Sequence, residues 1–126
     1  MKDFKNYYKI AAPAEDIYLA LTNPITIKLW TGEEAEMSTE PGSEFSLWDG
    51  SISGKNLEFI PGKKIVQQWY FGEDGPESIV TIILHPDGAG TSVELKHTNI
   101  PDHDFKDITE GWNEMYFGAL IEFYEE

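Results

Sequence analysis

The sequence contains no cysteine and no arginine among its 126 residues. The lack of cysteine excludes disulfides, thiolate metal ligands and a cysteine nucleophile. Arginine is the side chain best suited to phosphates, and nucleic-acid binding depends on clustered positive charge. Nine lysines oppose 23 acidic residues, which gives a net charge of −14. We therefore expect the chain to bind neither nucleic acid nor an anionic membrane surface.

Long hydrophobic runs are also absent. No apolar stretch approaches the roughly 20 residues that span a bilayer, and the opening residues "MKDFKNYYKI" lack the apolar segment of a signal peptide. These absences predict a cytoplasmic protein. The chain is 40% hydrophobic and 25% charged, a globular composition. Without visible repeats or linkers, we expect a single domain over residues 1–126.

Hydrophobic periodicity divides the chain into helical and extended segments. The early part predicts a strand followed by two short helices, and the period then changes to two, with turns at Asp49-Gly50 and Pro61-Gly62. Gly54 predicts a bulge or a sharp bend. The predicted strands are 4–12, 44–50, the stretch around Gly54, 64–71, 78–85 and 91–98, and the predicted helices are 13–23, 25–30 and 104–124.

This order of elements predicts an α+β fold. Six to seven consecutive antiparallel strands twist and curl, and only the last helix, roughly 30 Å long, would cover the concave face. Residues spaced by three and four predict one apolar stripe on that helix. The stripe consists of Ile108, Trp112, Met115, Ala119 and Phe123, widened by Tyr116 and Leu120.

Three segments, 45–69, 90–98 and 111–123, resemble a known family. They are similar to the C-terminal domain of the activator of the ninety-kilodalton heat-shock chaperone's ATPase and to its stand-alone bacterial homologues, within the START-like (SRPBCC) superfamily. The matching features are Gly50 and Gly54 around a strand, Pro61 before Lys63-Lys64-Ile65-Val66, Trp69, Gly90-Thr91, and Gly111-Trp112 with Tyr116-Phe117. The resemblance implies a helix-grip fold, in which a curved antiparallel sheet wraps around a long C-terminal helix and two short helices follow the first strand.

The inward-facing side chains of such a fold either fill a core or border a cavity between the sheet and the last helix. The sequence leaves both alternatives open. In the cavity alternative, His97, Gln67 and Tyr116 would orient the polar end of an apolar ligand. The candidate cavity residues are Trp30, Phe45, Leu47, Gln67, Trp69, Phe71, Ile82, Leu84, Leu95, His97, Trp112, Met115, Tyr116 and Ala119.

Three functional hypotheses follow. The first is non-enzymatic binding of a hydrophobic or amphipathic small molecule in that cavity. The alternative, implied by the resemblance, is a protein-interaction module that acts like a co-chaperone on a heat-shock chaperone ATPase. The third is a cyclase- or hydratase-type enzyme, which needs a second titratable group near His97, and the sequence supplies none. We predict no catalytic residue and no cofactor. We also predict no metal site, because the carboxylates of 102–107 suit helix capping better than they suit convergence on one metal ion.

Overall fold

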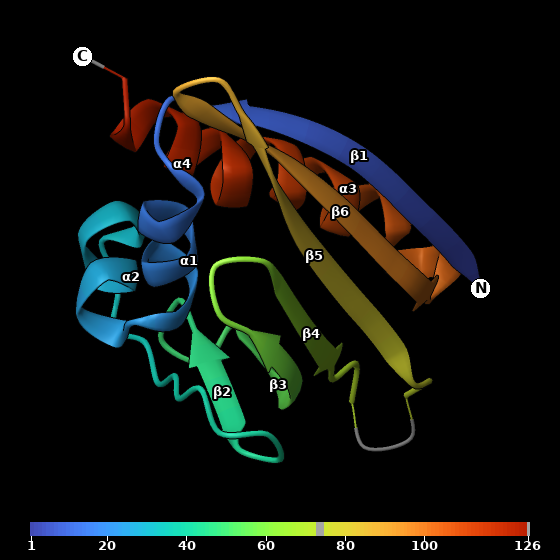
Figure 1. Ribbon diagram of the computed structural model, residues 1–126. Coiled ribbons are helices and arrows are strands. Elements are labelled where there is room, and N and C mark those ends of the chain that lie inside the picture. Colours follow the sequence, from blue (N-terminus) through green and yellow to red (C-terminus); the bar gives the residue numbers. More distant parts are fainter. Residues whose placement is uncertain (73–74, 126) are drawn as a thin grey trace.

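One curved sheet and one layer of helices make up the computed structural model, which describes residues 1–72 and 75–125 (Figure 1). The chain begins with a strand and two short helices, continues through five strands and ends in a long helical segment. The elements are β1 (Lys2–Ile10), α1 (Ala14–Thr22), α2 (Pro24–Thr31), β2 (Glu44–Leu47), β3 (Ile52–Ile60), β4 (Lys64–Trp69), β5 (Ser78–Asp87), β6 (Gly90–Ile100), η1 (Asp102–Asp104), α3 (Phe105–Gly111), η2 (Trp112–Tyr116) and α4 (Phe117–Phe123).

The sheet has the strand order β1-β6-β5-β4-β3-β2, and every neighbouring pair is antiparallel. Figure 1 shows α3 and α4 running behind β1 and β6, whereas α1 and α2 lie together at one end of the sheet. The predicted helix-grip α+β fold is confirmed. None of the helices in the described ranges has the length and apolar character needed to cross a lipid bilayer.

Asn23 and Gly32 bound α2. The Asn23 side chain accepts hydrogen bonds from the backbone N–H groups of Ile25 (2.9 Å) and Thr26 (3.3 Å), which satisfies two donors that a helix start leaves unpaired. Pro24 occupies the first turn, where no backbone donor is needed. Gly32 ends the helix with φ +80, a left-handed conformation that glycine adopts without strain.

The irregularity of β3 lies two residues beyond its predicted position. The register shifts between Asn56 and Glu58, so Gly54 itself belongs to a regular antiparallel pair. Gly54 has another role, since a Cβ there would lie 2.0 Å from the backbone oxygen of Gln68 and 2.7 Å from a ring carbon of Phe45. The glycine therefore permits close packing of β3 against its neighbours and does not bend the strand.

The last helix is not one regular α-helix, which corrects the predicted stripe. A π-helical segment, η2, interrupts it between α3 and α4. A π turn holds one more residue than an α turn, so every later side chain rotates relative to the expected face. Phe117, which lay outside the predicted stripe, is buried as a result, whereas Tyr116 and Leu120 are buried as predicted. Two members of the predicted stripe are exposed instead of buried, namely Met115, at 60%, and Phe123.

Candidate functional site

The π-helical segment places two large aromatic side chains against the concave face of the sheet. Trp112 and Tyr116, at its two ends, are both buried. The backbone of Tyr116 has φ −90 and ψ −84, which departs from α-helical values near −63 and −42. Single π turns within α-helices occur frequently at functional sites. This segment is therefore a candidate functional site.

A buried hydrogen-bond chain holds Trp112. Its Nε1–H donates to Nδ1 of His97 at 3.0 Å, and Nε2 of His97 lies 2.7 Å from Oγ of Ser78. Ser78 Oγ in turn donates to the carbonyl oxygen of Thr98 at 2.8 Å. Because Nδ1 accepts a hydrogen bond, the neutral ring carries its proton on Nε2 and donates it to Ser78. Both ring nitrogens of His97 are thus committed to the protein.

Burial is the main cause of the pKa shifts of His97 and Tyr116. Burial lowers the pKa of His97 from 6.5 to about 4, because the surroundings disfavour the charged imidazolium. Burial also raises the pKa of Tyr116 above its ordinary value, so its hydroxyl is neutral. A neutral histidine with both nitrogens hydrogen-bonded has no free lone pair for proton abstraction. This geometry favours a structural role for His97 over general-base catalysis.

A second polar chain holds Trp69. Its Nε1–H donates to the side-chain oxygen of Gln67 at 3.1 Å, and the Gln67 amide donates to Asn56 at 3.0 Å. The Asn56 amide ends the chain on the carbonyl oxygen of Ser38 and the hydroxyl of Ser43. Across the described residues, every fully buried side-chain nitrogen or oxygen has a hydrogen-bond partner. Gln67 and His97 are therefore satisfied by the protein itself.

Aromatic rings fill the space between the sheet and the helix. The Trp69 and Trp112 rings stack with centroids 4.6 Å apart, and His97 contacts both rings edge-on. Trp112 also lies 4.6 Å from Tyr116 and 5.6 Å from Phe117. Side chains of this size bury about 150–250 Å² each. The centre of the predicted cavity is therefore occupied by protein atoms.

The candidate cavity residues fall into three groups. Phe71 and Ala119 are half-buried and pack against the core, whereas Met115 is exposed. The others are buried: Trp30, Phe45, Leu47, Gln67, Trp69, Ile82, Leu84, Leu95, His97, Trp112 and Tyr116.

A small hollow, the aromatic pocket, remains between η2 and the β2–β3 turn. Its volume is about 250 Å³. Four candidate residues line it: Trp69, Trp112, Met115 and Tyr116. The sequence analysis did not assign its other lining residues to the site: Trp48, Ser51, Ile52, Asp107, Ile108 and Gly111.

Trp48 reaches the aromatic pocket because the turn begins one residue earlier than predicted. Trp48, Asp49 and Gly50 all have positive φ, at 49, 52 and 92. Strict alternation from Leu47 would send Trp48 to the outer face, but the left-handed backbone turns it inward. Its ring lies 5.9 Å from Trp30 and 5.7 Å from Tyr116. The Asp-Gly pair was a signal for the turn, although not for its start.

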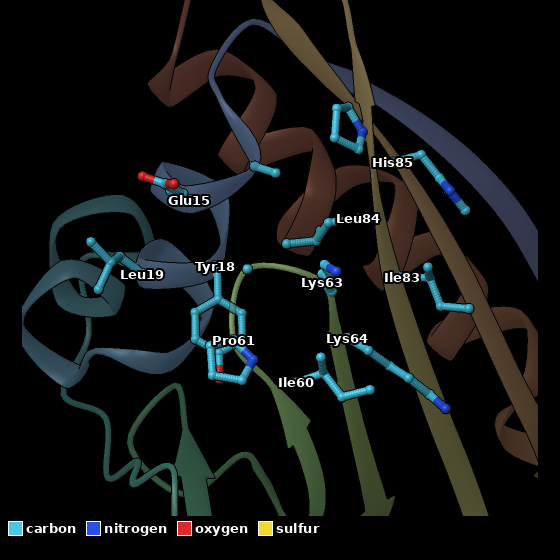
Figure 2. Close-up of a pocket in the computed structure, with 13 residues that line it drawn as sticks. Glu15, Tyr18, Leu19, Ile60, Pro61, Lys63, Lys64, Ile83, Leu84 and His85 are labelled. Carbon is cyan, nitrogen blue, oxygen red and sulfur yellow. The ribbon is translucent and has the colours of Figure 1, made fainter.

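A larger hollow, the α1 groove, lies between α1, the β3–β4 turn and the end of β5. Its volume is about 850 Å³. In Figure 2, Glu15, Tyr18 and Leu19 come from α1, and Ile60 and Pro61 come from the end of β3 and the turn that follows it. The remaining lining residues are Ala14, Gly62, Lys63, Lys64, Ile83, Leu84, His85 and Pro86.

Neither hollow offers a ready metal site. Over residues 1–72 and 75–125, no three histidine or carboxylate side chains gather in a group that could hold a metal ion. Of the two η1 carboxylates, Asp102 pairs with the N-terminal amine at 2.9 Å, and Asp104 lies 3.2 Å from Nε2 of His103. The predicted helix capping is wrong, because no side-chain hydrogen bond caps η1 or α3.

The fold and the aromatic site define a helix-grip α+β domain with a packed interior. The family model described as "Activator of Hsp90 ATPase homolog 1-like protein" matches residues 11–124 of this domain. The chain belongs to that family.

Two curated relatives carry the same description of function. An activator of 90 kDa heat shock protein ATPase homolog from Dictyostelium discoideum is 39% identical over 100 residues, which cover 77% of this chain and 26% of that protein. Homolog 1 from Homo sapiens is 25% identical over 108 residues, which cover 84% of this chain and 32% of that protein. The chain thus spans between a quarter and a third of these relatives.

A solved structure matches over nearly the full length of both chains. The crystal structure of an HSP90 activator from Plasmodium falciparum superimposes with a TM-score of 0.85 and 26% identity. The match covers 95% of this chain and 94% of that one.

Proposed function

We propose that this chain is a protein-interaction module that binds an Hsp90-type chaperone and stimulates its ATPase. The observation that carries the proposal is the 39% identity to an activator of the 90 kDa heat shock protein ATPase over 77% of the chain. The match covers only 26% of that relative, so its activity is extended to this chain as a proposal.

The interior supports a scaffold role. The stacked Trp69 and Trp112 rings and the two buried polar chains make a rigid support for surface features. Among the described residues, His97 is the one buried histidine, and both of its ring nitrogens are hydrogen-bonded within the protein. This arrangement favours binding through the surface over chemistry in the interior.

The proposal is tested with the Hsp90-type chaperone of the source cell. We expect binding at tens of micromolar or tighter by titration calorimetry, together with a faster chaperone ATPase. The ATPase rate without the chain, and with a chaperone-specific inhibitor, separates stimulation from contaminating activity. Absence of binding at tens of micromolar would contradict the proposal.

A second candidate function is binding of a small apolar molecule in the aromatic pocket. The supporting observation is its lining of aromatic and aliphatic side chains around about 250 Å³, slightly below the ~300 Å³ at which ordinary ligand pockets begin. A pocket of this size suits a molecule of one or two rings. Of the fourteen predicted cavity residues, only the four that line the aromatic pocket belong to this proposed binding site.

Native mass spectrometry of protein purified from its own host tests this second function. We expect an additional mass from a bound small molecule. Ile108→Arg should remove it, because Ile108 lines the pocket without being fully buried. Leu29→Arg, at an exposed α2 position outside the pocket lining, is the matched control. An unmodified mass for the wild type, or an adduct retained in Ile108→Arg, would rule out this candidate.

A further inference from the structure

The α1 groove is the largest hollow described above, and exposed apolar side chains border it. Leu19 of α1 is 53% exposed, and Ile60 at the end of β3 is 40% exposed. Tyr18, Pro61 and Pro86 add further apolar surface to the same walls. Single exposed aliphatic residues are common, but several around one concave surface indicate a binding site for an apolar partner.

The walls of the groove are fixed by backbone hydrogen bonds. The Lys63 N–H donates to the carbonyl oxygen of Ile60 at 2.9 Å, and the Lys63 carbonyl oxygen accepts from the N–H of Leu84 at 2.8 Å. The backbone of the β3–β4 turn is thus tied to β5. A preformed surface loses little conformational entropy on binding.

Two prolines narrow the kind of occupant. Pro61 and Pro86 line the groove and have no backbone N–H, so these positions cannot donate to an added strand. The occupant is therefore held mainly by side-chain contacts and not by strand addition.

Charge identifies the occupant further. The groove lining includes two adjacent lysines and one carboxylate, Glu15, in a chain that has nine lysines against 23 acidic residues. Lys64 points away from α1 in Figure 2 and pairs with Glu58 at 3.6 Å. Lys63 has no ion-pair partner among the residues that the structure describes, and Figure 2 shows it between the β3–β4 turn and β5. A carboxylate of a partner would complement this free cation.

We propose that the α1 groove docks an acidic, apolar peptide segment of a protein partner. Apolar side chains of the segment contact Leu19, Tyr18 and Ile60, and a neighbouring carboxylate pairs with Lys63. This inference rests on the proposed function, a protein-interaction module. It names the surface that such a module would use and the chemistry of its partner. It adds a position in the fold that the family relationship does not specify, and none of the residues that line this groove also lines the aromatic pocket.

The probe is a random peptide library selected against the immobilised full chain. We expect enriched peptides that place aspartate or glutamate within a few residues of leucine, isoleucine or phenylalanine. Affinities of synthetic versions are then measured by fluorescence anisotropy. Lys63→Glu and Leu19→Glu should each weaken binding by about 10-fold or more, because each places a negative charge in the groove.

Two control variants make the same chemical change elsewhere. Lys106→Glu reverses a lysine on α3, and Leu29→Glu changes an exposed leucine on α2. Both should bind the peptides as the wild type does. Selection of peptides without acidic residues, failure to enrich any peptide, or equal affinities for groove and control variants would each overturn the proposal.

The same variants separate this inference from the proposed function. If the chaperone binds the wild type and both groove variants equally, and the library yields no acidic consensus, the groove proposal fails while the proposed function stands. If acidic peptides bind the groove but the chaperone does not bind the chain, the proposed function fails and the groove proposal stands.

Discussion

Replacing Trp112 with alanine is expected to lower the free energy of unfolding by about 3–5 kcal/mol, the range measured for buried Phe or Trp to alanine changes. Trp112 is 2% exposed, stacks on Trp69 at 4.6 Å and donates a hydrogen bond to His97. The substitution removes the ring contacts and leaves Nδ1 of His97 without its donor. Urea unfolding followed by far-UV circular dichroism measures the change without relying on the deleted fluorophore.

Met115→Ala is the matched control, because Met115 lies in the same π-helical segment with its side chain 60% exposed. Its substitution should change stability by less than ~1 kcal/mol. A loss below ~1 kcal/mol for Trp112→Ala would contradict the packed interior. It would mean that the ring borders an empty space.

This comparison decides between the two alternatives that the sequence left open. A cavity lining predicts that Trp112→Ala impairs ligand binding more than stability, whereas a core predicts the reverse. The stacked rings and the closed hydrogen-bond chain favour the core at Trp112. Trp112 is available to a ligand only where it lines the aromatic pocket.

The fold was predictable because its signals are local. Alternation along a strand and the spacing of apolar residues along a helix depend on neighbours in the sequence, and the structure contains those elements within a few residues of the predicted bounds. The resemblance supplied the arrangement of sheet and helix. Irregularities in strand register were harder to predict from the sequence. Gly54 illustrates this, because a glycine in a strand is compatible with either a bulge or close packing.

The candidate site was only partly predictable, for two physical reasons. A π turn inserts one residue without a clear sequence signal, which moved Met115 outward and brought Phe117 inward. Alternation along the strand assigns Trp48 to the outer face of the sheet, but its left-handed backbone turns the side chain inward. Cavity volume depends on how such side chains meet across elements, and no local pattern in the sequence encodes it.

The acid sensitivity of the fold is expected to depend on His97. Burial lowers its pKa from 6.5 to about 4 in the folded chain, so the folded state binds fewer protons than the unfolded state between these values. The stabilisation is fully present above pH 6.5 and is lost as the pH falls toward 4. At 1.36 kcal/mol per pKa unit, the loss amounts to about 3 kcal/mol.

His97→Asn isolates this contribution, because the asparagine oxygen would still accept the Trp112 N–H but does not titrate. The groups that the structure places around His97 are Trp112, Ser78, Trp69 and Phe71, none of which changes charge in this range. Urea unfolding of both proteins from pH 7 to 4 should therefore show a stability difference that shifts by about 3 kcal/mol in favour of the variant at low pH. Surface carboxylates titrate equally in both proteins and cancel. Parallel pH curves, or an NMR titration of wild-type His97 with a midpoint near its ordinary value, would mean that the imidazole is not held neutral by the buried chain.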